Sequence, residues 1–394
     1  MNQSHASTSS QGPRDTEGAQ AGAAGPAKWL AIVALIYLLL VAVGTIGSGF
    51  KWASGGAEGA ERLFAFATNP FMGLLMGSLG TALVQSSSTV TSVIVGLVAG
   101  GLPVSTAIPM IMGANIGTTV TNTLVSLGHI GEKSEFRRAF SAATVHDFFN
   151  LMAVVIFLPL EMATGLLEKI ALWLSEIMTG SANLDTGSFN LLKAATKPVS
   201  SSIRDILSGI PEPFGGILMI LIGILLIFFS IYYMGKLLKQ VMVGRAKAML
   251  HAAIGRGPVA GVFSGTVVTV LVQSSSTTTS LAVPLAGSGV FGLKEIYPFT
   301  LGANIGTTIT ALLAATAISG GNAVFAMEIA LVHMLYNTFA VFLIYSVPFL
   351  RNIPLVGAQK LADLAAERKA LAIGYIVFVF FVIPLICVGI SMLF

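Results

Sequence analysis

Long apolar stretches alternate with short polar ones along most of this 394-residue chain. The first stretch, 29–50, is about 20 residues long, which is enough to cross a bilayer at about 1.5 Å per residue. Further stretches of the same character predict membrane-spanning helices at 105–127, 139–160, 214–234, 296–317, 323–349 and 370–394. The pattern indicates an all-α polytopic membrane protein, and we expect it in the lipid of the cell inner (plasma) membrane.

Two more apolar regions, 62–101 and 257–289, are interrupted near their middles by the same polar segment, Gln-Ser-Ser-Ser-Thr. Non-helical backbone at membrane depth survives only where protein or a water-filled cavity satisfies its polar groups. We therefore expect each region to form a re-entrant, broken-helix hairpin.

The two halves of the chain repeat each other. Residues 70–101 and 258–289 share 16 identities in 32 positions without a gap. Two more pairs follow in the same order. Gly-Ala-Asn-Ile-Gly-Thr-Thr occurs at 113–119 and 302–308, and a Val-His motif that ends in Asn occurs at 145–150 and 332–337. Three matched elements in one order exclude a chance similarity of apolar runs.

Loop charges predict how the repeats are oriented. The loop 235–257 holds five basic residues and no acidic one, and 161–213 is net acidic. By the positive-inside rule the first is cytoplasmic and the second is extracytoplasmic, so the two repeats are inverted. The expected organisation is a disordered tail at 1–28, a transmembrane repeat at 29–160, an extracytoplasmic loop at 161–213 with a candidate interfacial helix at 166–178, a second repeat at 214–350, and a cytoplasmic loop with a C-terminal transmembrane helix at 351–394.

Composition excludes several classes. The chain is 55% hydrophobic and 10% charged, with one cysteine and a net charge of +4, whereas soluble domains have about 25% charged residues. A secreted disulfide scaffold, a disordered chain and a nucleic-acid-binding protein are excluded. Motifs of metalloproteases, serine hydrolases and phosphate-loop ATPases are missing from the sequence. We therefore expect no enzyme, and uphill transport would use an ion gradient.

The paired Gln-Ser-Ser-Ser motifs supply anion-binding chemistry. An apolar helix resumes after each motif, so the serines lie at a helix N-terminus with free N–H groups. Two such ends facing each other would bind a tetrahedral oxyanion such as phosphate. The candidate substrate residues are Gln85, Ser86, Ser87, Ser88, Gln273, Ser274, Ser275 and Ser276. The alternative, that these serines only bond the preceding turn or pack helices, suits an isolated triplet better than a doubled one.

The Gly-Ala-Asn-Ile-Gly-Thr-Thr motifs supply hard oxygen ligands. Because 63–127 contains no Lys or Arg, mobile cations would balance the anion's charge. Neutral oxygens from Asn, Thr and backbone freed at unwound glycines suit a monovalent cation. The candidates are Asn115, Thr118, Thr119, Asn304, Thr307 and Thr308, together with Asp147, a carboxylate deep in a predicted span. The alternative reading of the motif is close helix packing through small residues.

Two histidines, His146 and His333, lie in the third repeated element. We interpret them as structural, with ring N–H groups satisfied by neighbouring backbone. A role in proton transfer is the alternative.

These paired motifs, and Phe136-Arg137-Arg138-Ala139-Phe140 with the Val-His-Asp segment that follows, resemble the type II sodium-dependent inorganic phosphate cotransporters. The resemblance covers roughly residues 60–160 and 215–350. It implies sodium-coupled uptake of inorganic phosphate by alternating access, with Na⁺ as the co-transported ion. It also implies that Asn150, Thr307 and Thr310 bind sodium or lie beside it, and the repeat extends this to Asn337.

In the same family an aspartate at the position of Asp147 marks electrogenic members, so the resemblance implies electrogenic transport. The outer loop of this sequence is short and lacks the disulfide cysteines of the animal members, which implies a bacterial-type member. Two other functions stay open. One is a sodium-coupled carrier of another small anion, such as a dicarboxylate or sulfate. The other is a channel or non-transporting membrane scaffold.

Overall fold

The computed structural model describes residues 26–55, 69–180, 187–253, 256–318 and 321–391, and every regular element in these ranges is helical. The first half contains α1 (Pro26–Ser54), α3 (Pro70–Val84), α4 (Ser87–Gly100), α5 (Val104–Gly117), α6 (Val120–Ser126), η3 (Leu127–His129), α7 (Lys133–Thr164), α8 (Leu166–Gly180) and α9 (Gly187–Leu207). The second half contains α10 (Phe214–Ala253), α11 (Pro258–Val272), α12 (Ser275–Gly287), α13 (Leu293–Thr316), α14 (Ala323–Ser346), α15 (Pro348–Glu367), α16 (Lys369–Val377), η5 (Phe378–Val382) and α17 (Ile383–Ser391).

Within the described residues, six helical segments are long and apolar enough to cross a membrane. They confirm the predicted all-α membrane protein and coincide with six of the predicted spans. The continuous span predicted at 105–127 is wrong, because α5 ends at Gly117 and α6 begins at Val120. The predicted disordered tail is wrong for 26–28, which belong to α1, and its residues 1–25 lie outside the described part.

Both predicted hairpins are broken where the polar segment occurs. α3 and α4 flank the first break, and α11 and α12 flank the second. Residues 62–68, the start of the first predicted hairpin, lie outside the described residues.

Regions predicted as loops contain helices. The candidate interfacial helix at 166–178 forms as α8, and α9 was not predicted. The segment from residue 351, expected as a cytoplasmic loop, is helical, since α15 continues to Glu367 and packs on α7. The charged residues of α15 make the segment look like a loop in the sequence. The helix nevertheless carries a stripe of small buried residues, Ala358, Ala362, Ala365 and Ala366. The neighbour on which α15 packs, α7, cannot be identified from the sequence.

The packing of the helices repeats as the sequence does. α8 follows α7 but packs on α14, and α15 follows α14 but packs on α7. Similarly, α4 contacts α13 and α14, whereas α12 contacts α6 and α7. Each repeat therefore packs its second hairpin helix on the other repeat, and the helix that follows each repeat does the same.

Glycines let each hairpin's first helix touch its neighbour backbone to backbone. A Cβ added at Gly77 would overlap the carbonyl oxygen of Met110, and one at Gly265 would overlap that of Phe299. The glycines of the repeated Asn-containing motif act in the same way from the opposite side of each contact: Gly113 and Gly117 on α5 and Gly302 and Gly306 on α13 meet the facing backbone of α3 and α11. These glycines thus allow close helix packing, which was the alternative interpretation of the Gly-Ala-Asn-Ile-Gly-Thr-Thr motif.

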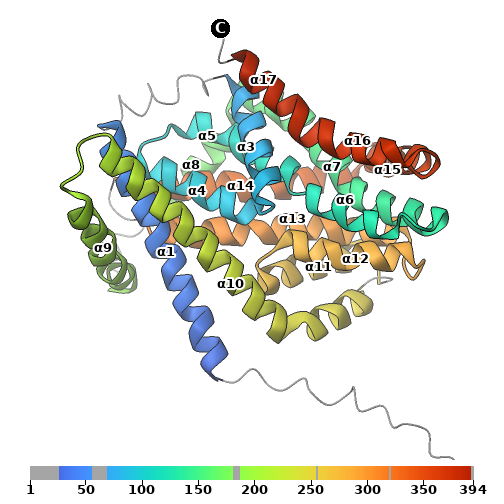
Figure 1. Cartoon of the computed structure of the whole chain (residues 1–394), viewed down its shortest axis with the longest axis horizontal. Coiled ribbons are helices and arrows are strands. Elements are labelled where there is room, and N and C mark those ends of the chain that lie inside the picture. Colours follow the sequence, from blue (N-terminus) through green and yellow to red (C-terminus); the bar gives the residue numbers. More distant parts are fainter. Residues whose placement is uncertain (1–25, 56–68, 181–186, 254–255, 319–320, 392–394) are drawn as a thin grey trace, which may run out of the picture.

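Two groups of outer helices flank this core. α1 and α10 pack on each other, and in Figure 1 they overlap at the upper left and separate toward the lower edge. The C-terminal span, α16 to α17, lies along the upper edge in Figure 1 and packs through η5 and α17 on α3.

Candidate functional site

The two polar breaks have the same backbone conformation. Gln85 adopts φ 54° and ψ 30°, and Gln273 adopts φ 56° and ψ 28°. In the described part of the chain these are the non-glycine residues with positive φ. This left-handed conformation costs a non-glycine residue about 1–2 kcal/mol. Because both breaks adopt this unfavourable conformation, the surrounding contacts must offset its cost at each of them.

A serine caps each helix that follows. Ser86 and Ser274 have extended backbones, and their Oγ atoms each accept a hydrogen bond of 3.2 Å, from Thr89 N–H and Thr277 N–H respectively. The next serines, 87 and 88 in α4 and 275 and 276 in α12, are buried in the first turn. The first N–H groups of a helix lack partners within that helix, so each break has backbone donors at a buried helix start.

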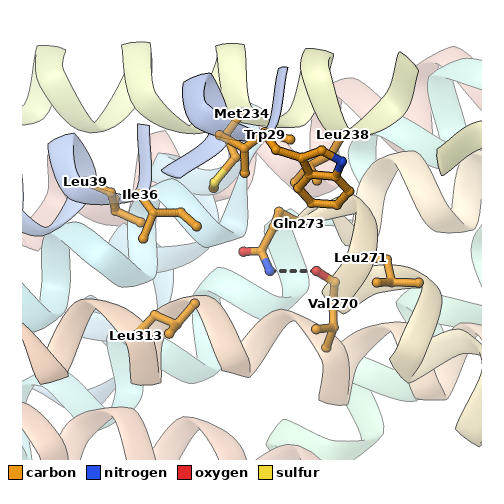
Figure 2. A pocket seen from close by; sticks show the side chains of 10 residues that line it. Trp29, Ile36, Leu39, Met234, Leu238, Val270, Leu271, Gln273 and Leu313 are labelled. Atoms are coloured by element: carbon orange, nitrogen blue, oxygen red, sulfur yellow. Dashed lines mark hydrogen bonds between the residues drawn. The ribbon is translucent and has the colours of Figure 1, made fainter. Parts of the chain in front are cut away.

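The two glutamines differ in their side chains. Gln273 donates to the carbonyl oxygen of Val270 (2.7 Å) and accepts from the Thr310 hydroxyl (2.9 Å). It forms the polar wall of an otherwise apolar cavity of about 190 Å³ between α1, α10, α11 and α13 (Figure 2). By contrast, Gln85 is exposed, and the hydroxyl of Thr121, which matches Thr310, is buried without a partner. The Gln–Thr bond is therefore made in the second repeat and absent from the first.

No hydrogen bond among the described residues joins the two Gln-Ser-Ser-Ser motifs directly. Elsewhere, side chains of the two repeats are bonded to one another. Asn115 of α5 donates to Asn337 of α14 (2.8 Å), and its Oδ1 faces His333 Nε2 at 3.3 Å. In the same way, Asn304 of α13 donates to Asn150 of α7 (2.8 Å), and its Oδ1 accepts from His146 Nε2 at 2.5 Å.

We call these two sets the Asn–His clamps: Asn115, Asn337 and His333 form one, and Asn304, Asn150 and His146 form the other. Both join residues of opposite repeats, and all six side chains are buried. The expectation that the histidines bond neighbouring backbone is wrong, because Nε2 meets an asparagine and Nδ1 has no partner in either ring.

The clamps also explain why only the first Asn-containing motif interrupts its helix. Asn150 donates to the backbone carbonyl of Asn115 (2.8 Å), whereas its counterpart Asn337 donates to the carbonyl of His333 in its own helix. The Asn115 carbonyl also accepts from the backbone N–H of Thr118, three residues later. The N–H of Thr119 bonds to the Ile116 carbonyl in place of the Asn115 carbonyl four residues earlier. The prediction that unwound glycines free backbone carbonyls is therefore wrong for α13, which is continuous. In α5, the carbonyl of Asn115 already accepts a hydrogen bond from Asn150.

The predicted threonines mostly bond their own helices. The hydroxyls of Thr118, Thr119, Thr307 and Thr308 donate to backbone carbonyls three or four residues earlier. Their oxygens keep free lone pairs in this arrangement. Thr310 differs, since its hydroxyl is directed at Gln273.

Asp147 is buried in α7. Its Oδ2 accepts a hydrogen bond of 2.8 Å from the Tyr375 hydroxyl, and its Oδ1 makes no hydrogen bond of good geometry. The matching residue of the second repeat is Met334, so the charge is present on one side of the repeat symmetry.

Sequence reasoning missed Asn122 of α6. Its Oδ1 accepts hydrogen bonds from Thr279 (2.9 Å) and Ser280 (3.1 Å), which ties α12 to the first repeat. The matching residue is Ala311, and Ser92, which matches Ser280, is buried without a partner. An asparagine present in one repeat and absent from the other was the signal that could have identified it.

This chain is similar to known proteins over most of its length. The model of the Na⁺/Pi-cotransporter family matches residues 38–181 and 225–393. The chain is 33% identical over 430 residues to sodium-dependent phosphate transport protein 2A of Oryctolagus cuniculus, which covers 92% of this chain and 67% of that protein. It is 31% identical over 456 residues to sodium-dependent phosphate transport protein 2B of Homo sapiens, covering 93% and 66%.

The chain thus spans about two thirds of the length of these relatives. No solved structure matches it significantly.

Proposed function

The chain belongs to the Na⁺/Pi-cotransporter family, and from that premise we propose that it imports inorganic phosphate together with sodium across the cell inner membrane. The relatives are named as transport proteins and not as enzymes, in agreement with a role without catalysis. The observation that carries the proposal is the pair of serine-capped helix starts at identical left-handed breaks, one in each repeat.

Phosphate binding is proposed at these two breaks. The substrate residues are those of the two Gln-Ser-Ser-Ser motifs, 85–88 and 273–276. Buried N–H and hydroxyl donors at a helix start complement an oxyanion without a fixed cation. Such neutral donors bind phosphate while allowing its release, because they hold no permanent positive charge at membrane depth.

Sodium binding is proposed around Asp147 and the repeated Asn-containing motifs. The Oδ1 atom of Asp147 is a buried, hard anionic oxygen without a hydrogen bond of good geometry, and it lies beside Thr119, another member of the proposed set. The threonine hydroxyls that donate to their own helices keep oxygen lone pairs for a cation. Each clamp asparagine oxygen accepts one hydrogen bond and so keeps one of its two lone pairs. These groups form the proposed sodium set: Asn115, Thr118, Thr119, Asp147, Asn150, Asn304, Thr307, Thr308, Thr310 and Asn337.

Transport is proposed to occur by alternating access between two inverted repeats. The reciprocal packing of α8 on α14 and of α15 on α7 supports a two-fold relation between the halves. The Gln–Thr bond made at Gln273 and missing at Gln85 supports a state in which one half is closed and the other is open. The apolar contacts at Gln273 and the exposure of Gln85 agree with this reading.

Phosphate uptake into proteoliposomes tests the function. We expect saturable uptake of labelled phosphate that stops when choline replaces sodium in the external medium. Excess unlabelled sulfate or dicarboxylate should leave the uptake unchanged, whereas unlabelled phosphate should abolish it. Uptake that ignores sodium, or that sulfate suppresses as well as phosphate does, would contradict the proposal.

A further inference from the structure

The carboxylate of Asp147 is held from outside the two repeats. Its Oδ2 accepts a hydrogen bond of 2.8 Å from Tyr375, which lies in α16 of the C-terminal span. Hydrogen bonds to a charged group are about twice as strong as neutral ones. Oδ1 is buried and makes no hydrogen bond of good geometry, and the Thr119 hydroxyl is the other side chain that interacts with the carboxylate. The bond to Tyr375 is therefore the contact from outside the two repeats that helps to fix how the carboxylate is turned.

The Tyr375 ring is itself fixed by aromatic neighbours. It makes edge-on contacts with Phe140 of α7, at 6.4 Å between ring centroids, and with Phe380 of η5, at 5.8 Å. The interplanar angles of 72° and 89° are those that aromatic pairs favour. Since the ring is held on two sides, the hydroxyl can reach Asp147 without a large cost in side-chain entropy.

The segment that follows Tyr375 is a π-helix, η5. Single π-turns within α-helices are rare and are often found at functional sites. The wider turn carries Phe380 onto the Tyr375 ring, and η5 together with α17 packs on α3. α3 ends at Val84, directly before Gln85, so one span contacts both the carboxylate of α7 and the first helix of the hairpin in which Gln85 is exposed.

We propose that Tyr375 is a positioning residue for cation coupling, whose hydroxyl turns Asp147 so that Oδ1 is presented to the transported cation. The C-terminal span thereby connects the occupancy of Asp147 to hairpin α3–α4. This inference rests on the proposed sodium-coupled function and assigns to that function a residue outside both repeats.

Replacing Tyr375 with Phe removes the hydroxyl and keeps the ring contacts. The carboxylate then loses its 2.8 Å donor and keeps only the neighbouring Thr119 hydroxyl, which makes the charged carboxylate more costly to keep and freer to rotate. We expect the sodium concentration for half-maximal uptake to rise threefold to tenfold and the charge moved per phosphate to fall. The half-saturating phosphate concentration, measured at saturating sodium, should change less than twofold.

Tyr336→Phe is the matched control. Tyr336 is also buried, but its hydroxyl has no hydrogen-bond partner, and the matching residue of the first repeat is Phe149. This variant should retain the wild-type sodium dependence and charge ratio.

The experiment measures sodium-dependent phosphate uptake and phosphate-evoked current in proteoliposomes for both variants, alone and combined with Asp147→Gly. In the Asp147→Gly background, Tyr375→Phe should have no further effect on either quantity. Wild-type values for Tyr375→Phe, or an effect that persists without Asp147, would overturn the role of Tyr375 and leave the transport function intact. An absence of sodium-dependent uptake by the wild-type chain would overturn both.

Discussion

Asn304 and His146 lie 158 positions apart in sequence, yet Nε2 of the histidine donates to Oδ1 of the asparagine across 2.5 Å. Asn304 belongs to the second repeat and His146 to the first, so this bond joins the halves of the protein. The amide of Asn304 also donates to Asn150 (2.8 Å). One side chain thus satisfies two buried polar groups of the opposite repeat.

Asn304→Ala should therefore destabilise the protein even without sodium. It leaves His146 Nε2 and Asn150 Oδ1 unpaired, at about 1–3 kcal/mol for each buried group. We expect a lower unfolding temperature of purified protein in choline buffer, with the exposed Asn352→Ala as control. An unchanged unfolding temperature in choline, combined with a loss of sodium affinity, would mean that Asn304 is a ligand and not part of a clamp.

Gly302→Ala should separate α11 from α13. The added Cβ would overlap the backbone carbonyl of Val262, and neither backbone can yield as a flexible side chain could. We expect a loss of about 1–3 kcal/mol, the usual cost of overpacking. Gly44→Ala in α1 is the control, since its Cβ would meet nothing within 4 Å. Equal unfolding temperatures for the two variants would refute the close helix contact.

Ser274→Ala should weaken both a helix cap and the proposed phosphate site. Loss of the cap of α12 costs about 1 kcal/mol, and loss of a donor should raise the half-saturating phosphate concentration several-fold. Ser288→Ala, at the exposed C-terminal end of the same helix, should change neither quantity. A variant that loses stability but keeps its phosphate affinity would reduce Ser274 to a structural cap.

The difference between Gln85 and Gln273 predicts unequal thiol accessibility. With Cys387 replaced by Ala, Gln85→Cys should react with a water-soluble maleimide in sodium-free buffer, because the side chain is exposed. Gln273→Cys should react slowly, since that position faces Thr310 and an apolar cavity. Sodium and phosphate should slow the first reaction and accelerate the second. Parallel changes at both positions would argue against alternation.

Asp147→Gly should reduce the phosphate-evoked current and leave part of the uptake. One net positive charge moved inward across about 100 mV contributes about 2.3 kcal/mol, or roughly fifty-fold in accumulation. Met334→Gly, at the matching position of α14, makes the same backbone change without removing a charge. An undiminished current per phosphate in Asp147→Gly would show that Asp147 does not carry the coupling charge.

The sequence by itself determined the features that depend on local pattern. Apolar length predicted the spans, because a bilayer requires about 20 apolar residues of any order. Gln-Ser-Ser-Ser predicted the two breaks, since Ser at a helix start satisfies free N–H groups. The repeat was readable because identity between segments needs no knowledge of their contacts.

Tertiary structure alone decided which groups meet. The Asn–His clamps, the Thr310–Gln273 bond and the Tyr375–Asp147 bond join residues from 37 to 228 positions apart, and no local pattern encodes such pairs. The glycines of the repeated motif were expected to unwind a helix, but they face the backbone of α3 and α11, and only the packed neighbours show this. The two copies of one motif also differ in helix continuity, because Asn150 reaches a carbonyl in α5 while Asn337 bonds within its own helix. Sequence identity fixes which groups are available, and the fold decides which of them are partners.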